Sequence, residues 1–422
     1  MMKRLLTSLA VVATSALAQA GPIDGSWAAK TTIGKAELPF RVELSGEGDH
    51  FKGTLYDGEV PVTSTSGKLD GDRFVLNFDH FLGKLEGRFK DGRIEGIYRN
   101  TAREDLPTLA FTAERPTPRR PADPKVVPSI DGLWEIPNES AKGEKAWRLI
   151  IHQKGDEATA SILRIDGDTG ALTGHYQDGK FVLGIFAGPK ALRLDVEPAK
   201  DGSLNLTLHS PYAKFLTKSG EYDKTYLHYV AHRPADARAK GLPRPSDPLK
   251  HTTVRNESEP FRFRFPDVDG KLYSNDDPRF RGKVVVAVVT GTWCPNCHDE
   301  AQFLVELHKK YRDRGLEVVA LDFEEEEQQE QGYKRVRSFV KKYGVEYPYL
   351  IAGTPLEMWT KVPQAVNLNT WPATFFVGRD GLVKQIHAGF ASPASAEFNL
   401  ELKKEFTETV ERLLAQARTA SR

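Results

Sequence analysis

The spacing of hydrophobic and polar residues differs between the first and the second part of the chain. From about residue 23 to residue 232, short runs such as residues 40–44 and 74–78 partly alternate between apolar and polar positions. A period of two predicts antiparallel strands that bury one face. Turns with positive φ are expected where Asp-Gly pairs separate these runs. The pairs begin at Asp57, Asp70, Asp91, Asp166 and Asp178.

The β-rich part contains an internal repeat. The matching segments are residues 23–27 and 130–134, 73–76 and 180–183, and 113–116 and 231–234. The first two pairs share an offset of 107 residues and the third has 118, so the second copy carries about eleven more residues. We expect Trp27 and Trp134, at equivalent positions, to close the core of each copy. The pattern predicts two tandem antiparallel β domains, residues 21–116 and 129–234, each a barrel or a sandwich of about eight strands.

The remaining residues predict a third domain, at 251–420, with alternating strands and helices. Residues 283–289 form an uninterrupted apolar run, typical of a strand buried on both faces. Further strands are expected at 316–323, 373–377 and 382–387, and helices after Cys297, at 333–343 and at 397–415. The acidic run at 324–327 is expected to be a solvated loop or helix start. Proline-rich connectors at 116–128 and 234–248 separate the three domains.

Composition and charge narrow the class of protein. The 59 basic and 58 acidic side chains give a net charge of +1, which favours neither nucleic acid nor an anionic membrane. Two cysteines in 422 residues exclude a disulfide framework and a zinc site of cysteines alone. Residues 1–20 resemble a signal peptide, with Lys3 and Arg4, an apolar run and a cleavage site near Ala20. We therefore expect a periplasmic or otherwise extracytoplasmic protein, with no membrane span in the mature chain.

The two cysteines lie three residues apart, between a buried strand and a helix, which is a redox arrangement. Cys294 is expected at the helix start, where free N–H groups and the helix dipole stabilise a thiolate. Pro295 suits the first helical position because its missing N–H has no partner there in any case. These considerations predict Cys294 as the exposed nucleophile with the lower pKa, and Cys297 as the partly buried resolving thiol. No bound cofactor or metal is expected besides a redox-active Cys294–Cys297 disulfide.

Several motifs surround this pair. Residues 293–300 match the pattern W-C-x-x-C-x-x-E, and the other matching segments are 265–271, 281–285, 342–348 and 371–376. Together they resemble the exported TlpA/ResA-type thiol–disulfide oxidoreductases, which are thioredoxin-like, over about residues 255–417. The resemblance does not extend to the two β domains.

The resemblance implies a substrate groove and its partners. Pro372 is expected to be cis and to line the groove with Trp293, Pro295 and Trp371. Glu300 is expected either to carry a proton during exchange or to complement the helix dipole. Protein thiols or disulfides are the implied substrates, with an upstream redox donor and a lean toward reduction. Residues 289–292 and the bulky Trp371 depart from the family pattern, which leaves the substrate and the reduction potential open.

Three other interpretations are weighed against this one. Cys294 to His298 also satisfies C-x-x-C-H, the attachment motif of c-type haem, with His298 otherwise expected to be exposed. A peroxiredoxin-like antioxidant shares the outer fold, but Ala287 and Gly291 stand where its motif needs Pro and Thr. The third alternative is an extracytoplasmic binding protein whose β domains bind a protein, a glycan or a second subunit. The connector at 234–248 further predicts that residues 251–422 fold alone.

Overall fold

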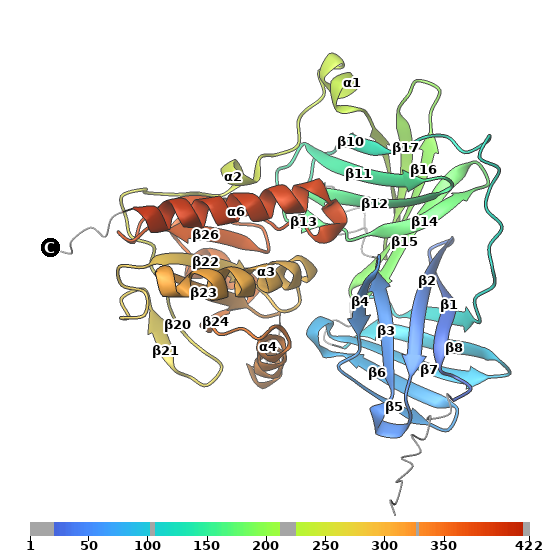
Figure 1. Cartoon of the computed structure of the whole chain (residues 1–422), viewed down its shortest axis with the longest axis horizontal. Helices are drawn as coiled ribbons and strands as arrows, with labels where there is room; N and C mark the ends of the chain where they lie inside the picture. The colour runs from blue at the N-terminus through green and yellow to red at the C-terminus, as the bar shows by residue number, and fades with distance from the viewer. Residues whose placement is uncertain (1–20, 102–105, 212–224, 326–328, 417–422) are drawn as a thin grey trace, which may run out of the picture.

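A computed structural model describes residues 21–101, 106–211, 225–325 and 329–416. The predicted signal peptide at 1–20 and residues 417–420 of the predicted third domain lie outside this part of the chain. Figure 1 shows an α/β unit, coloured yellow to red, beside two β-rich units. Among the described residues, none of the helices combines the length and the apolar composition that a membrane span needs.

The first β-rich unit is one continuous antiparallel sheet. Its strands pair in the order β4-β3-β2-β1-β9-β8-β7-β6-β5. The alternation in the sequence is visible in β9, where Leu109, Phe111 and Ala113 are buried and the residues between them are exposed. The elements are β1 (Gly25–Ile33), β2 (Ala36–Ser45), η1 (Gly48–His50), β3 (Lys52–Asp57), β4 (Val60–Thr63), β5 (Ser66–Asp70), β6 (Arg73–Phe78), η2 (Asp79–Phe81), β7 (Gly83–Lys90), β8 (Arg93–Asn100) and β9 (Leu109–Glu114).

The second β-rich unit has a similar succession of antiparallel strands, but its first and last strands meet in the isolated bridge between Glu135 and His232. Its ladders follow the order β10-β11-β12-β14-β15-β16-β17-β18, and β13 pairs with the end of β12. The predicted β-rich character is confirmed, whereas the division into separate barrels or sandwiches stays a prediction. The elements are β10 (Gly132–Pro137), β11 (Ala146–Lys154), β12 (Glu157–Arg164), β13 (Gly167–Asp168), β14 (Leu172–Gln177), β15 (Lys180–Ala187), β16 (Lys190–Pro198), β17 (Leu204–His209) and β18 (Tyr226–Ala231).

The repeated tryptophans have the same surroundings in both copies. Trp27 and Trp134 are buried. Each indole N–H donates a hydrogen bond to the carbonyl four residues earlier, with an N–O distance of 2.8 Å. Arg115 lies 3.9 Å above the ring of Trp27, and Arg233 lies 3.7 Å above that of Trp134. The repeat therefore preserves a core residue together with the cation that covers it.

The two copies also pack against each other. The ring of Phe186 stacks on Phe40 with centroids 4.3 Å apart, and Phe186 belongs to the core of the first copy. Lys190 Nζ lies 2.7 Å from the Asp57 carboxylate across the same junction. The predicted boundaries between domains stay predictions, because the side-chain packing crosses them.

The connector at 234–248 contains more structure than an extended spacer. Helix α1 (Pro234–Ala239) begins with proline at its first position, where no N–H is needed. Arg238 on α1 forms an ion pair with Glu135 on β10, so the connector is attached to the second copy. A second short helix, α2 (Pro248–His251), starts at Asp247, whose side chain accepts the N–H of Leu249.

The third unit has the predicted alternation of strands and helices. Its central sheet has the order β24-β23-β22-β26-β27, with β22, β23 and β24 parallel and β26 and β27 antiparallel to their neighbours. All seven residues of β22 are buried, as expected for an uninterrupted apolar run. Core clusters lie on both faces of this sheet.

The elements of this unit are β19 (Thr253–Val254), β20 (Arg264–Pro266), β21 (Leu272–Ser274), β22 (Val284–Thr290), α3 (Pro295–Tyr311), η4 (Arg312–Arg314), β23 (Leu316–Phe323), α4 (Gln329–Tyr343), β24 (Tyr349–Gly353), η5 (Pro355–Glu357), α5 (Met358–Lys361), β25 (Ala365–Val366), β26 (Ala373–Val377), β27 (Val383–Ala388), η6 (Pro393–Ser395) and α6 (Glu397–Ala415). The prediction of four strands missed β24, a five-residue edge strand that follows Pro348 and ends at Gly353. Helix α4 begins four residues before the predicted start at Tyr333, whereas the bounds of α6 are confirmed.

Candidate active site

The two cysteines lie at the start of α3, directly after the buried strand β22. Cys294 is the N-cap residue, Pro295 is the first helical residue, and Cys297 lies one turn on. The backbone N–H of Cys297 donates to Cys294 Sγ at 3.4 Å. The sulfur of the predicted nucleophile therefore accepts a hydrogen bond from an N–H of the helix start. Both cysteines are free thiols in the structure.

The predicted groove residues meet at this helix start. The Trp371–Pro372 peptide bond is cis, as the resemblance implied. Cys294 Sγ–H donates to the Trp371 carbonyl at 3.3 Å, so the proline loop lies opposite the sulfur. The rings of Trp293 and Trp371 are 5.5 Å apart at 57°, and they form one aromatic wall beside Cys294.

The prediction that Cys294 is exposed was wrong. Only 4% of Cys294 and 1% of Cys297 are accessible to solvent. The helix start buries Cys297 as expected, whereas the burial of Cys294 arises from its surroundings beyond α3.

Burial raises the pKa of two groups at this site, the Cys297 thiol and the Glu300 carboxyl. Burial raises the pKa of Cys297 well above its usual value, and the adjacent sulfur of Cys294 adds to the effect. Burial also raises the pKa of Glu300 to about 8, although Thr374 Oγ1 donates a hydrogen bond to its carboxylate. The negative charge of Glu300 is among the causes that raise the pKa of Cys297. The geometry is therefore compatible with the predicted proton-carrying role of Glu300, which stays a prediction.

His298 is buried, which corrects the expectation that it is exposed. Tyr343 Oη lies 2.8 Å from His298 Nδ1, and the Thr292 carbonyl lies 2.7 Å from Nε2. Burial lowers the pKa of His298 well below 6.5, and the nearby Lys342 adds to the effect. A neutral ring with both nitrogens engaged ties α3 and α4 to the loop before the cysteines. This geometry does not favour His298 as a haem ligand.

A buried ion pair also supports that loop, a role that the sequence pattern did not predict for its residues. Glu324 is buried instead of solvated, and its Oε1 accepts from Thr292 N at 2.8 Å and from Thr292 Oγ1 at 2.7 Å. Arg335 on α4 pairs with the other oxygen of Glu324. Burial and the proximity of Glu324 raise the pKa of Asp322 well above its usual value. An acidic run alone does not indicate this role, because its partner Arg335 is supplied by a later helix.

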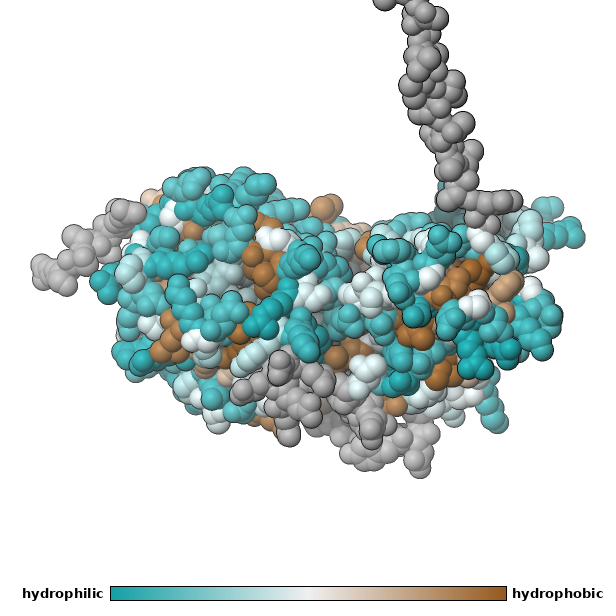
Figure 2. Space-filling view, turned by 90° about the horizontal axis from the view of Figure 1, so that it is seen from below, coloured by the Kyte–Doolittle hydropathy of each residue, from teal (hydrophilic) through white to brown (hydrophobic). Residues whose placement is uncertain are grey.

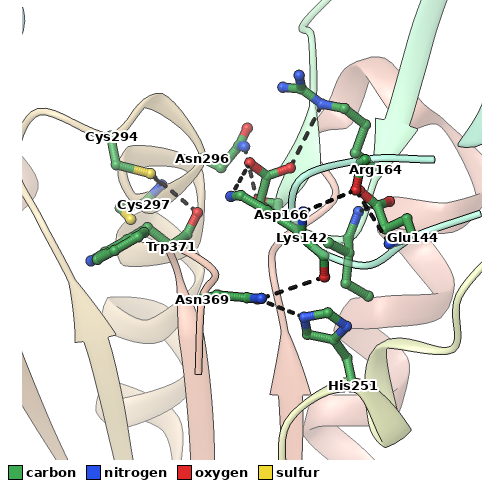
Figure 3. Close-up of polar contacts among 12 residues, drawn as sticks. Lys142, Glu144, Arg164, Asp166, His251, Cys294, Asn296, Cys297, Asn369 and Trp371 are labelled. Atoms are coloured by element: carbon green, nitrogen blue, oxygen red, sulfur yellow. Dashed lines mark hydrogen bonds and ion pairs between the residues drawn. The ribbon is translucent and has the colours of Figure 1, made fainter. Parts of the chain in front are cut away.

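The second β-rich copy reaches the cysteine site. Asn296 Nδ2, between the two cysteines, donates to the Asp166 carbonyl at 3.0 Å (Figure 3). On the other side, Asn369 Nδ2 donates to the Lys142 carbonyl at 3.4 Å. Lys142 Nζ lies 2.6 Å from the Asp166 carboxylate, which links these two points of contact.

A cavity of about 540 Å³ lies between the second copy and the cysteines. Its lining from the α/β unit consists of Trp293, Cys294, Pro295, Asn296 and Trp371. The described lining from the second copy is mixed: three cationic, two anionic and several apolar residues. These residues are Lys142, Arg164, Asp166, Asp168, Thr169, Pro189, Lys190, Ala191, Leu192, Leu208 and Ser210.

The three cations of the cavity form ion pairs: Lys142 and Arg164 with Asp166, and Lys190 with Asp57 of the first copy. Burial acts to lower the pKa of Lys190, but the carboxylates of Asp57, Asp299 and Asp168 outweigh it and raise the pKa above its usual value. Burial raises the pKa of Asp299, which lies on α3 two residues after Cys297, to about 7, with Lys190 acting in the opposite direction. The cysteine site is thus electrostatically coupled to both β-rich copies.

Comparisons with known proteins address the α/β unit. The Redoxin family model matches residues 254–401. Thiol-disulfide oxidoreductase ResA of Bacillus cereus (strain ZK) is 32% identical over 121 residues, which are 29% of this chain and 62% of that protein. ResA of Geobacillus kaustophilus (strain HTA426) is 30% identical over 139 residues, 33% of this chain and 72% of that protein. The match to the Bacillus cereus relative thus spans less than two thirds of its length.

A solved structure gives a further likeness. The thiol:disulfide interchange protein, thioredoxin family protein from Chlorobium tepidum TLS, is 24% identical, with a TM-score of 0.30. The match covers 38% of this chain and all of that one.

The central sheet, the CxxC at the start of α3 and the cis-proline loop opposite it define a thioredoxin-like domain with a dithiol site. By its similarity to the Geobacillus relative, the chain belongs to the ResA family of thiol–disulfide oxidoreductases. The family resemblance seen in the sequence is confirmed.

Proposed function

We propose that this protein is an exported thiol–disulfide oxidoreductase that uses the Cys294–Cys297 dithiol, with reduction as its direction. The observation that carries the proposal is the placement of Cys294 Sγ at the N-terminus of α3, opposite the carbonyl that precedes the cis-proline. A helix N-terminus stabilises a thiolate, and the thiolate is the species that attacks a disulfide.

The proposed reaction proceeds in two exchanges. The Cys294 thiolate attacks one sulfur of the substrate disulfide, whose S–S bond breaks, and one substrate thiol leaves with a proton. Cys297 then loses its proton and attacks Cys294 Sγ, which releases the second thiol. Two electrons pass to the substrate, and the protein keeps a Cys294–Cys297 disulfide. Since burial raises the pKa of Cys297, a nearby base favours the second exchange, and Glu300 is the candidate for that role.

Other parts of the sequence interpretation belong to the same proposal. We expect cleavage of the signal peptide near Ala20 and action in an extracytoplasmic, oxidising compartment. Catalysis is expected to need no bound cofactor besides the redox-active disulfide. Protein thiols or disulfides and an upstream redox donor are the partners that the family suggests. Because Cys294 is buried, a protein substrate has restricted access to its sulfur.

The proposal is tested by trapping the mixed disulfide. Cys297→Ser should accumulate an adduct of Cys294 with the substrate thiol, because the second exchange is removed. Cys294→Ser should form little adduct, since Cys297 is buried and its raised pKa keeps it protonated. Adducts are measured by intact mass after reaction with a small disulfide, with and without subsequent reductant.

Equal trapping by both variants would contradict the assigned roles of the two sulfurs. Trapping by neither, in protein whose fold is intact by circular dichroism, would overturn the proposed exchange. That result would favour the binding-protein interpretation. Peroxide reduction faster than disulfide reduction by the wild type would favour the peroxiredoxin-like interpretation.

A further inference from the structure

The second copy approaches the dithiol with residues 165–168, the turn after β12 together with β13, which we call the cover turn. It contacts the thioredoxin-like domain on two sides of the groove beside Cys294. Asn296 Nδ2 donates to the Asp166 carbonyl, and Gly167 forms a bridge parallel to Phe390, just after β27. The cover turn thus contacts the CxxC and the loop after β27 at the same time.

The fit of the cover turn leaves no space for a second chain. A Cβ on Gly167 would lie 2.4 Å from Asn296 Nδ2 and 2.5 Å from the Phe390 carbonyl. A Cβ on Gly389 would lie 2.2 Å from the Ile165 carbonyl. Gly167 also has φ of +121°, a conformation that glycine adopts most readily. An extended peptide could reach this part of the groove only after the cover turn had moved away.

Buried hydrogen bonds hold the cover turn in place. The Asp168 carboxylate accepts from Ser392 N at 2.7 Å, from Ser392 Oγ at 2.8 Å and from Ser395 Oγ at 2.6 Å. Within the second copy, Glu144 Oε1 accepts the N–H of Ile165 at 2.8 Å. Hydrogen bonds to a charged acceptor are stronger than those between neutral groups, so Asp168 stabilises the contact between the cover turn and the two serines.

Beneath the cover turn, the cavity gives access to Cys294. Its volume of about 540 Å³ lies within the roughly 300–1,000 Å³ of small-molecule sites. The lining combines apolar walls, including Leu192 and Trp371, with the ionic groups of Lys142 and Lys190. Asn296 Oδ1 is buried without a hydrogen-bond partner among the described residues, so it is an acceptor that a ligand can use.

We propose that the second β-rich copy makes the dithiol selective for low-molecular-weight disulfides, which enter this cavity, over disulfides in protein strands. This inference rests on the proposed exchange and names its substrate class. The small disulfide is reduced to two thiols by the two exchanges described above. The two electrons come from the Cys294–Cys297 dithiol, which is oxidised to the disulfide. A protein strand reacts slowly because Asp168 must first release the serines of η6.

The first experiment measures the accessibility of Cys294 to alkylating reagents and does not depend on the disulfide exchange reaction. The reduced full-length protein carrying Cys297→Ser is alkylated with iodoacetamide or with a maleimide on a long polyethylene glycol chain. We expect iodoacetamide to modify Cys294 and the polymer reagent to react slowly. Asp168→Ala should raise the rate with the polymer by about tenfold, the factor that corresponds to about 1.4 kcal/mol, with little change for iodoacetamide. Asp178→Asn, in an exposed turn of the same copy, is the matched control and should change neither rate.

Gly167→Ala is a second route to the same opening, because its methyl group would collide with Asn296 without creating a buried unpaired charge. Circular dichroism and an unchanged iodoacetamide rate show that each variant is folded. Equal rates of the wild type with the small and the polymer reagent, each taken relative to its rate with free cysteine, would show that the cover turn does not restrict access to Cys294. If neither variant raised the rate of alkylation by the polymer reagent, the role of the cover turn would be overturned.

Selectivity is then measured in single turnovers of reduced wild type and Asp168→Ala with hydroxyethyl disulfide and with insulin. We expect the wild type to favour the small disulfide, and Asp168→Ala to gain at least about tenfold in its rate with insulin. A wild type that reduces insulin as readily as the small disulfide overturns the selectivity and leaves the exchange intact. Failure to reduce either disulfide, with normal alkylation, overturns the proposed function and leaves the cover intact.

Discussion

At the scale of single residues, the burial of Glu300 makes the stability of the folded protein depend on pH. Its pKa is about 8 in the folded protein and near 4.5 in an unfolded chain, so unfolding between these values releases a proton. Stability therefore falls as the pH rises through this window. Glu300→Gln keeps the shape and removes the titration. We expect the wild type to lose up to about 1.4 kcal/mol relative to the variant for each pH unit of the window, measured by urea unfolding.

The exchange reaction of Glu300→Gln provides the functional readout. If Glu300 takes the proton of Cys297, the variant should resolve mixed disulfides more slowly, while the first attack by Cys294 keeps its rate. Parallel stability curves for the two proteins from pH 5 to pH 8 would contradict the raised pKa. An unchanged resolving step would leave Glu300 with a structural role only.

Arg335 tests the buried support of the loop before the cysteines. Arg335→Ala leaves the buried Glu324 carboxylate without its ion-pair partner, so we expect a loss of about 3–5 kcal/mol in unfolding free energy. Arg337 lies on the same helix and pairs with Asp269 at the surface, where such pairs contribute less than about 1 kcal/mol. Urea unfolding of Arg335→Ala and Arg337→Ala makes the comparison. Similar losses in both variants would show that burial of the pair is not decisive.

At the scale of elements, the equivalent Trp–Arg pairs predict equivalent effects in the two copies. Arg115 donates to the Ser26 and Pro22 carbonyls, and Arg233 donates to the Leu133 and Asp131 carbonyls. Arg115→Ala and Arg233→Ala should each cost about 1–2 kcal/mol through lost cation–π contact and lost hydrogen bonds. Arg120→Ala, on the exposed connector, should leave the unfolding midpoint unchanged. A large effect in one copy only would show that the repeat has diverged in its energetics.

Local patterns predicted the elements that the chain forms by itself. The apolar run of β22, the proline after Cys294 and the glycine at the end of α4 act within a few residues, so the sequence located these features. The equivalence of the two tryptophans followed from the repeat, whereas the arginines above their rings were not predicted. The edge strand β24 was missed because five residues after a proline carry too little pattern to separate a strand from a loop.

The candidate site was predictable only as far as one domain determines it. The cysteines, the cis-proline loop and Glu300 follow a motif and were found. The burial of Cys294 and His298 was not predicted, because the residues around them come from separate units. Phe81 of the first copy, for example, has its ring 4.6 Å from that of His298. Contacts between units leave no periodic trace in either partner.

At the scale of the whole molecule, the units share apolar contacts. Ile150 and Leu163 of the second copy belong to a core cluster of the thioredoxin-like domain, together with Phe390 and Leu402. The face shown in Figure 2 is largely hydrophilic, and its hydrophobic residues form separate patches. The apolar surface between the units is therefore covered by their association and not left open to solvent.

This packing qualifies the expectation that residues 251–422 fold alone. The cluster around Phe261 and Phe375 lies wholly within this fragment, so we expect it to fold. Its melting temperature should be lower than that of the intact chain, because Phe390 and Leu402 lose their cover. The measurement is thermal unfolding of the fragment and of residues 21–422, together with binding of a hydrophobic dye. Equal melting temperatures and no dye binding would show that the contact contributes little.

The cover turn has a counterpart in the first copy. Strands β3 and β4 end and begin 107 residues before the end of β12 and the start of β13, so their turn occupies the same place in the repeat. There, Asp57 accepts the N–H of Ala171 at 2.7 Å and pairs with Lys190, both in the second copy. In each copy, this hairpin contacts the unit that follows it in the chain. Because the hairpin occupies the same place in both copies, one element of the repeat serves at both junctions between units. The hairpin of the first copy joins it to the second copy, and the hairpin of the second copy joins it to the domain that carries Cys294.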